Sequence, residues 1–265
     1  MNKYFIIALS FLVFACKEVP KDKITTNASE MEVKHVEETK YPKELFKVFE
    51  AHGGLDQWKT YRTLSFDIPN EGVIEKQVID LYKRSDKVTT PTFSLGYDGD
   101  YVWLLDPSES YTGKPKFYHN LMFYFYAMPF VFTDNGIIYE EVAPLVVDGV
   151  SYPGYKITYN AGVGASSKDH YYLHYDANTF QMKWLGYTVT YFSNETSDKV
   201  NWVNYNDWGK VDELLRPKSI TWHLVENGEL KGPRNTVNFE NASLSKTAMP
   251  NEFYAKPENG KVIVD

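Results

Sequence analysis

The sequence predicts a mainly β protein with a few helices, in which a long antiparallel meander forms most of the fold. Apolar and polar residues alternate with a period of two over much of the chain, first around Leu64, Phe66 and Ile68, as on a half-buried strand. Short turn sequences separate the alternating segments, such as DGD at 98–100 and ENGEL at 226–230. Because such turns join neighbouring strands into hairpins, we expect consecutive strands to pair antiparallel.

The N-terminal residues predict a lipoprotein leader. Residues 1–15 contain one charged residue, Lys3, followed by an apolar run that has the length of a signal-peptide core and is too short to span a bilayer. The sequence VFAC at 13–16 fits the bacterial lipobox and ends in the only cysteine of the chain. We therefore expect a lipoprotein signal peptide over 1–15 and lipid attachment at Cys16. The alternative is that Cys16 only follows a cleaved signal or an uncleaved anchor.

Residues 16–40 are expected to form the lipidated N-terminus and a flexible tether. They contain no aromatic residue and mix charges of both signs with Thr, Asn and Ser, so they have too little apolar surface to fold. The remaining residues, 41–265, are expected to form one domain, because a chain with 43% hydrophobic residues and this length can bury one substantial core.

The domain is expected to begin with a helix that ends at a glycine pair. Pro42 suits the first helical turn, and the apolar residues that follow it fall on one face. Gly53 and Gly54 are expected to adopt positive φ and to reverse the chain. A short second helical turn then brings Trp58 onto the end of the sheet.

Strands are expected to fill most of the remaining chain. After the first strand at 64–68, the alternating segments are 76–84, 87–97, 101–105, 137–142, 154–160, 169–176, 181–192, 200–208, 218–226 and 236–243. No period of about 20–50 residues repeats, so a solenoid or propeller has no support.

An aromatic segment interrupts this meander. Residues 116–128 are expected to be helical until Pro129 ends the helix. Helical spacing gives the segment two apolar faces, one that begins at Phe117 and one that includes Met122. Core packing explains one such face, whereas two favour a lid with the sheet on one side and a hydrophobic ligand on the other. The candidate ligand-binding residues are Phe117, Leu121, Met122, Tyr124, Phe125, Met128 and Phe130, together with Trp103 and Trp184.

The order of these motifs resembles the lipoprotein-localisation carrier superfamily of LolA-like and LolB-like proteins, in particular lipid-anchored bacterial envelope lipoproteins with that fold. The resemblance rests on AHGGLDQWKTYRTLSFDI at 51–68, YDGDYVWLLDP at 97–107, FYHNLMFYFYAMPFVFTD at 117–134 and the hairpin sequences that follow, up to about residue 240. It implies a strongly curved antiparallel sheet that forms an open, incomplete β-barrel, with helices over a hydrophobic cavity. The carriers themselves are not lipidated, so Cys16 makes this chain more similar to the outer-membrane receptor type.

Several function classes are disfavoured. The formal charge of −7 disfavours nucleic acid as a partner. The sequence contains no G-x-S-x-G, H-E-x-x-H or Walker A motif, so we expect no catalytic residue, no cofactor and no enzyme activity. His170 and His174 would lie about 13 Å apart on a strand, too far for one metal ion, so we expect no metal site.

The expected function is therefore the binding of a hydrophobic small molecule, a lipid, or the acyl chains of a lipoprotein in an open-barrel cavity. The expected location is the cell envelope of a Gram-negative bacterium, where palmitate or a similar acyl group on Cys16 would hold the protein at the outer membrane. Two alternatives stay open. The aromatic residues could be sugar platforms of an envelope glycan-binding module or glycan-active enzyme, or the chain could be a structural partner in an outer-membrane complex.

Overall fold

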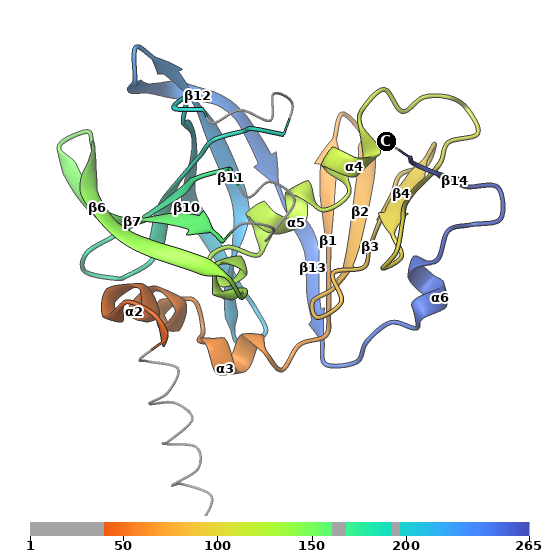
Figure 1. The fold of residues 1–265 in the computed structure, drawn as a ribbon, viewed down its shortest axis with the longest axis horizontal. Coiled ribbons are helices and arrows are strands. Elements are labelled where there is room, and N and C mark those ends of the chain that lie inside the picture. The colour runs from red at the N-terminus through yellow and green to blue at the C-terminus, as the bar shows by residue number, and fades with distance from the viewer. Residues whose placement is uncertain (1–39, 161–167, 192–196, 265) are drawn as a thin grey trace, which may run out of the picture. The chain divides into compact units, whose positions relative to one another are not determined.

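A computed structural model describes residues 40–160, 168–191 and 197–264 of the chain. The chain divides after Lys40 into two units, and Tyr41–Asp265 is the second. The predicted signal peptide, Cys16 and the tether up to residue 39 lie outside the described residues. The second unit is mainly β and contains two antiparallel sheets of seven strands each (Figure 1).

The strands of each sheet are mostly neighbours in sequence, as in a meander. Sheet A has the order β13 (Glu240–Ser245), β1 (Thr63–Asn70), β2 (Val73–Asp80), β3 (Asp86–Thr89), β4 (Ser94–Tyr97), β5 (Val102–Leu105) and β14 (Lys261–Val262). Sheet B has the order β12 (Glu229–Asn238), β11 (Leu214–Glu226), β10 (Asn201–Val211), β9 (Met182–Tyr187), β8 (Tyr171–Tyr175), β7 (Val150–Tyr159) and β6 (Ile137–Val147).

One residue, Phe239, joins the two sheets. Strand β12 ends in sheet B directly before it, and β13 begins in sheet A directly after it. The Phe239 N–H donates to the Lys218 carbonyl at 2.8 Å, and its buried ring packs on Phe66 and Tyr126. The predicted mainly β, antiparallel and open fold is confirmed. The expected single curved sheet is instead two sheets that meet at this position.

Helix α2 (Lys43–Ala51) and the short α3 (Leu55–Trp58) begin the unit, and the chain reverses between them. Gly53 and Gly54 have φ of 108° and 86°, the left-handed region that favours glycine. A Cβ on Gly53 would lie 2.6 Å from the Glu213 carbonyl oxygen, so the turn also needs glycine to approach β11. After the reversal, the Trp58 ring stacks on Phe130 with ring centres 5.0 Å apart.

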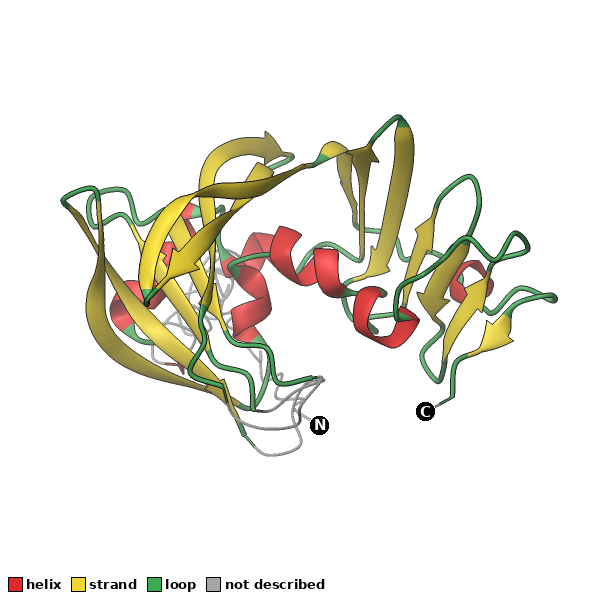
Figure 2. Ribbon diagram, turned by 90° about the horizontal axis from the view of Figure 1, so that it is seen from above, coloured by secondary structure: helices red, strands yellow, loops and turns green. Residues whose placement is uncertain are grey.

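Three short helical elements follow β5, namely α4 (Pro115–Tyr118), α5 (Leu121–Tyr126) and the 3-10 helix η1 (Phe130–Thr133). We call residues 115–133 the lid segment. The expected continuous helix is divided at His119 and Asn120, and the Met128–Pro129 peptide bond is cis. The helices of the lid segment run between the two sheets (Figure 2).

Two predicted strands are each divided, and one short strand was not expected. The segment at 87–97 forms β3 and β4, because the Thr90 hydroxyl accepts from the Phe93 N–H and closes a turn at Pro91. The segment at 236–243 is divided between β12 and β13. Strand β14 has two residues and follows α6 (Asn251–Tyr254), too short for any alternation to show. No helix in the described part of the chain has the length and apolarity needed to cross a membrane.

Candidate functional site

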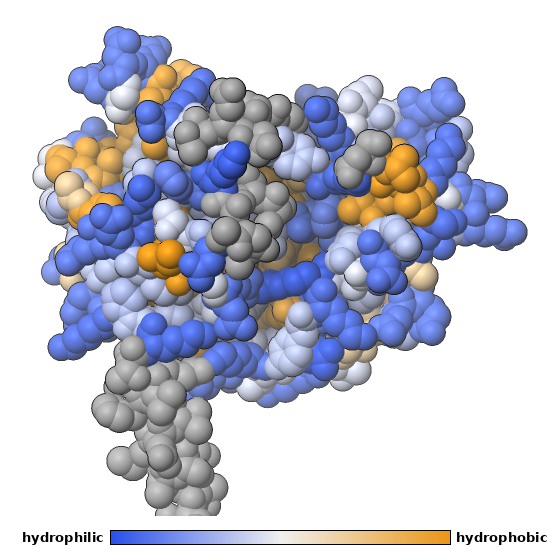
Figure 3. Space-filling view, viewed as in Figure 1, coloured by the Kyte–Doolittle hydropathy of each residue, from blue (hydrophilic) through white to orange (hydrophobic). Residues whose placement is uncertain are grey.

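An apolar cavity of about 520 Å³ lies between the lid segment and the inner face of sheet B. We call it the lid cavity. From the lid segment it is lined by Phe117, Asn120, Leu121, Tyr124, Phe125, Met128 and Val131, and from sheet B by Tyr159, Tyr171, Tyr187 and Trp222. The face seen in the space-filling view is mainly hydrophilic, with separate hydrophobic patches (Figure 3). Within the lid segment, the buried aromatic residues are Phe123, Phe125, Tyr126, Phe130 and Phe132.

Five predicted site residues meet in this cavity. They are the residues at i, i+4, i+7, i+8 and i+11 of the aromatic segment, namely Phe117, Leu121, Tyr124, Phe125 and Met128. The division of the helix at His119 therefore leaves this apolar face on one side of the lid segment. The other predicted residues do not line the cavity.

Met122 and Phe130 are buried in the core on other sides of the lid segment. The Phe130 ring stacks on Trp58, and the Arg216 guanidinium carbon lies 4.7 Å from the Phe130 ring centre and 5.6 Å from the Trp58 ring centre. Burial lowers the pKa of Arg216 to about 10. Phe130 thus joins the lid segment to α3 and β11.

The two predicted tryptophans lie elsewhere. Trp103 is fully buried in sheet A, where its indole N–H donates to the Tyr254 carbonyl at 2.9 Å. Trp184 lies on the outer face of sheet B and lines a different groove. Neither contributes to the lid cavity.

Sequence reasoning missed the residues that sheet B contributes. Tyr171 and Tyr187 are cross-strand partners in β8 and β9, so both point to the inner face of the sheet. Trp222 reaches the same face from β11, and its indole N–H donates to the Tyr187 hydroxyl at 2.9 Å. The alternation within each strand carried the signal, but the sequence did not show which of the two faces of sheet B packs against the lid segment.

Charged side chains also line the lid cavity. Arg84 and Asp134 form an ion pair at 2.7 Å, and the Arg84 guanidinium lies 5.0 Å from the Phe123 ring centre. The Asp169 carboxylate accepts from the Thr190 N–H at 2.7 Å. Lys116 lines the cavity as well. The cavity thus offers polar groups as well as an apolar lining.

Ionisable side chains hold the first part of the lid segment to sheet A. His119 Nδ1 lies 2.6 Å from the Asp86 carboxylate, and the Tyr118 hydroxyl donates to Glu75 at 2.9 Å. Burial raises the pKa of Asp86 to about 6 and also raises the pKa of Glu75. These contacts anchor the segment to β2 and β3.

Aromatic contacts hold the next part of the lid segment to sheet B. The Phe125 ring packs edge-on against Tyr187 and Trp222, at 5.3 Å and 5.2 Å between ring centres. The Phe125 carbonyl accepts from the buried Tyr205 hydroxyl at 2.9 Å. Phe125 is therefore both a wall of the lid cavity and a contact between the lid segment and sheet B.

Within the described residues, no group of three or more His, Cys, Asp and Glu side chains is placed to hold a metal ion. His174 is buried with Nδ1 2.9 Å from the Tyr152 carbonyl, and burial lowers its pKa. His170 lies just before β8.

Comparisons with known proteins concern the fold. No family model matches the chain, and no curated protein matches it. Among solved structures, it is similar to a DUF1329 family protein from Desulfovibrio piger, with 13% identity, a TM-score of 0.49 and coverage of 80% of this chain and 95% of that one. It is also similar to a LolA superfamily protein from Nitrosomonas europaea, with 10% identity, a TM-score of 0.44 and coverage of 73% and 88%.

A third similar structure is an outer membrane lipoprotein-sorting protein domain from Vibrio parahaemolyticus, with 9% identity, a TM-score of 0.39 and coverage of 72% and 87%. The structural neighbours thus include LolA superfamily proteins, as the sequence resemblance predicted. Identities this low concern the fold and do not tell what this chain binds.

Proposed function

We propose that this chain is a lipid-anchored cell-envelope protein that binds a hydrophobic ligand, an acyl chain of a lipid or of a lipoprotein, in the lid cavity. The observation that carries the proposal is the meeting of five lid residues with aromatic residues of sheet B around one cavity of about 520 Å³. Cavities of about 300–1,000 Å³ with mainly apolar walls and a few polar groups are typical of small-molecule sites. We assign no catalytic role to the site.

The hydrophobic effect supplies enough free energy for such a ligand. A 16-carbon chain gains about 0.8 kcal/mol for each buried methylene, or about 12 kcal/mol in total, before the ordering costs of binding are subtracted. Met128 has a flexible, polarizable side chain that adapts to chains of different shape. The charged residues Arg84 and Lys116 also line the cavity and are candidates to contact a polar head group.

The binding of a fluorescent fatty acid tests this proposal. Phe125→Glu places a carboxylate in the apolar wall, and because such a charge is costly to desolvate, we expect binding to weaken about 100-fold or more. Leu121→Glu, at a half-buried position of the same wall, is expected to act in the same direction with less risk to the fold. Tyr101→Glu is the matched control, because Tyr101 is 60% exposed and does not line the cavity.

Circular dichroism establishes which variants keep the fold. The proposal fails if the wild-type protein binds no fatty acid, or if folded Phe125→Glu and Leu121→Glu both bind as the wild type does.

The proposed anchor is Cys16, which is supported by the lipobox sequence VFAC at 13–16. Stable anchoring needs two or more acyl chains, which lipoprotein modification supplies, and we propose the outer membrane of a Gram-negative cell as the location. Cys16→Ala removes the only thiol, so we expect it to abolish labelling by a palmitate analogue and to release the protein from membranes. Equal labelling of the wild type and the variant would contradict the anchor.

A further inference from the structure

A second groove of about 960 Å³, lined by both polar and apolar residues, lies on the outer face of sheet B, opposite the lid cavity. We call it the outer groove. Strand pairing places Trp184, Asn204, Thr221 and Thr236 in one row across β9, β10, β11 and β12. Their sequence neighbours Leu185, Val203 and Trp222 point to the inner face, because successive side chains of a strand alternate.

Two hairpins form the walls of the outer groove. Val147, Asp148, Val150 and Tyr152 come from the β6–β7 hairpin, and Leu230, Lys231, Gly232 and Pro233 come from β12 where it leaves the β11–β12 turn. Both turns are tight, with positive φ at Asp148 and Gly149 and at Asn227 and Gly228. The groove is therefore built from paired strands and two-residue turns, with register shifts next to Asn204 and His223.

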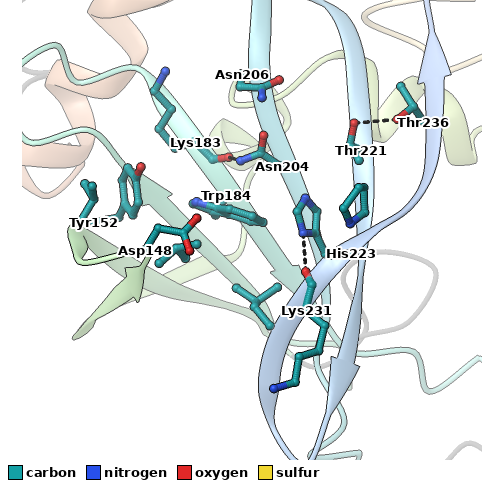
Figure 4. Close-up of a pocket in the computed structure, with 15 residues that line it drawn as sticks. Asp148, Tyr152, Lys183, Trp184, Asn204, Asn206, Thr221, His223, Lys231 and Thr236 are labelled. Atoms are coloured by element: carbon teal, nitrogen blue, oxygen red, sulfur yellow. Dashed lines mark hydrogen bonds between the residues drawn. The ribbon is translucent and has the colours of Figure 1, made fainter.

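The indole N–H of Trp184, like those of Trp58 and Trp202, has no protein acceptor among the described residues, whereas three other tryptophans have one. Trp103, Trp208 and Trp222 each donate this group to a protein oxygen. Trp184 is 5% exposed and lines the groove, and its indole nitrogen is not among the fully buried unpaired atoms, so a small part of the side chain faces the groove. Its ring packs edge-on against His223 at 4.9 Å, with Tyr152 on the other side (Figure 4).

The other groups of the groove floor are neutral hydrogen-bonding side chains. The Asn204 amide nitrogen donates to the Lys183 carbonyl at 3.2 Å, which leaves its amide oxygen as an acceptor (Figure 4). The Thr221 and Thr236 hydroxyls share one hydrogen bond at 2.9 Å. The Asn206 amide is exposed and forms no hydrogen bond with the described residues. Amides and hydroxyls both donate and accept, as sugar hydroxyls require.

The charges of the outer groove favour a neutral ligand. Lys231 is paired with Glu229 at 2.7 Å, and the other two charged residues of the lining, Asp148 and Lys183, have opposite signs. The apolar residues Val147, Val150 and Leu230 come from the walls, so the floor does not suit an acyl chain. A peptide strand would need a free sheet edge for its backbone, whereas the floor is the side-chain face of the inner strands β9, β10 and β11.

From these observations we infer that the outer groove binds a neutral glycan chain. Amide and hydroxyl groups of the floor would bond the sugar hydroxyls, the Trp184 indole N–H would donate to one of them, and the Tyr152 ring would contact an apolar sugar face. The site is separate from the lid cavity and does not depend on it. The volume of about 960 Å³ leaves room for several sugar rings.

Calorimetric titration of the full-length protein with cellohexaose, maltohexaose and chitohexaose tests the inference. We expect at least one of these neutral hexasaccharides to bind. Trp184→Phe keeps an aromatic ring but removes the N–H, and Asn206→Ala removes an exposed amide, so each is expected to weaken binding about tenfold. Asn178→Ala, in the exposed turn between β8 and β9, is the matched control and is expected to have no effect.

Phe125→Glu separates the two sites, because it alters the lid cavity only. We expect it to leave hexasaccharide binding unchanged. The inference is overturned if no hexasaccharide binds at concentrations up to about 10 mM. It is also overturned if binding is insensitive to both Trp184→Phe and Asn206→Ala, or is lost in a folded Phe125→Glu.

Discussion

At the scale of single residues, Asp86 is a carboxylate buried where the lid segment meets sheet A. Its exposed fraction is 1%, one oxygen contacts His119 and the other has no hydrogen-bond partner within the described residues. Burial, and to a smaller extent the Asp86 charge, raises the pKa of the nearby Tyr124 and Tyr254. Burial raises the pKa of Asp86 from 3.8 to about 6, because the charged form loses its hydration.

This shift predicts a pH dependence of stability. Because the pKa of Asp86 is higher in the folded protein than in the unfolded chain, protonation of Asp86 stabilises the folded protein. This stabilisation is fully present below about pH 3.8 and is lost as the pH rises through about 6. Asp86→Asn keeps a hydrogen-bonding group without the charge. We therefore expect its free energy of unfolding, relative to wild type, to rise by about 1–3 kcal/mol between pH 4 and pH 7.5.

Urea unfolding at the two pH values measures this change. Asp100→Asn, at an exposed turn, is the control and is expected to show no such rise. A difference between Asp86→Asn and wild type that stays constant with pH would show that the buried carboxylate does not titrate in this window.

At the scale of elements, the period of two located most strands, because sheet B and sheet A each bury one face. The sequence could not locate the junction at Phe239. The residue continues the apolar alternation of its segment, and only its packing on Phe66 and Tyr126 shows that the chain leaves one sheet and enters the other. The split at Thr90, by contrast, had a signal in the sequence, because Pro91 cannot donate a hydrogen bond within a strand.

For the lid segment, the sequence predicted the apolar face but not the interruption of the helix. Its helical spacing placed Phe117, Leu121 and Phe125 on one face, and all three line the lid cavity. The interruption at His119 follows no helix-breaking residue, and it occurs where Tyr118 and His119 contact Glu75 and Asp86. Such tertiary contacts override local helix propensity and are not visible in the pattern.

At the scale of the whole folded unit, sheet B has two faces with different chemistry. Its inner face contributes Tyr171, Tyr187 and Trp222 to an apolar cavity, and its outer face presents a polar floor around Trp184. The composition, with 21 tyrosines and 6 tryptophans, favoured a hydrophobic cavity and left sugar platforms open as the alternative. Strand register decides which aromatic residues point to the inner face of sheet B and which point to its outer face, and the sequence alone does not give that register.

Native mass spectrometry of the full-length protein, released from membranes with a mild detergent, tests most directly whether the lid cavity holds an acyl chain. We expect an added mass that matches a fatty acid or lipid on the wild-type protein. We expect that mass to be absent from folded Phe125→Glu and to be retained by Tyr101→Glu. A wild-type protein observed without any lipid, or the same lipid bound equally to folded Phe125→Glu, would contradict the proposed function.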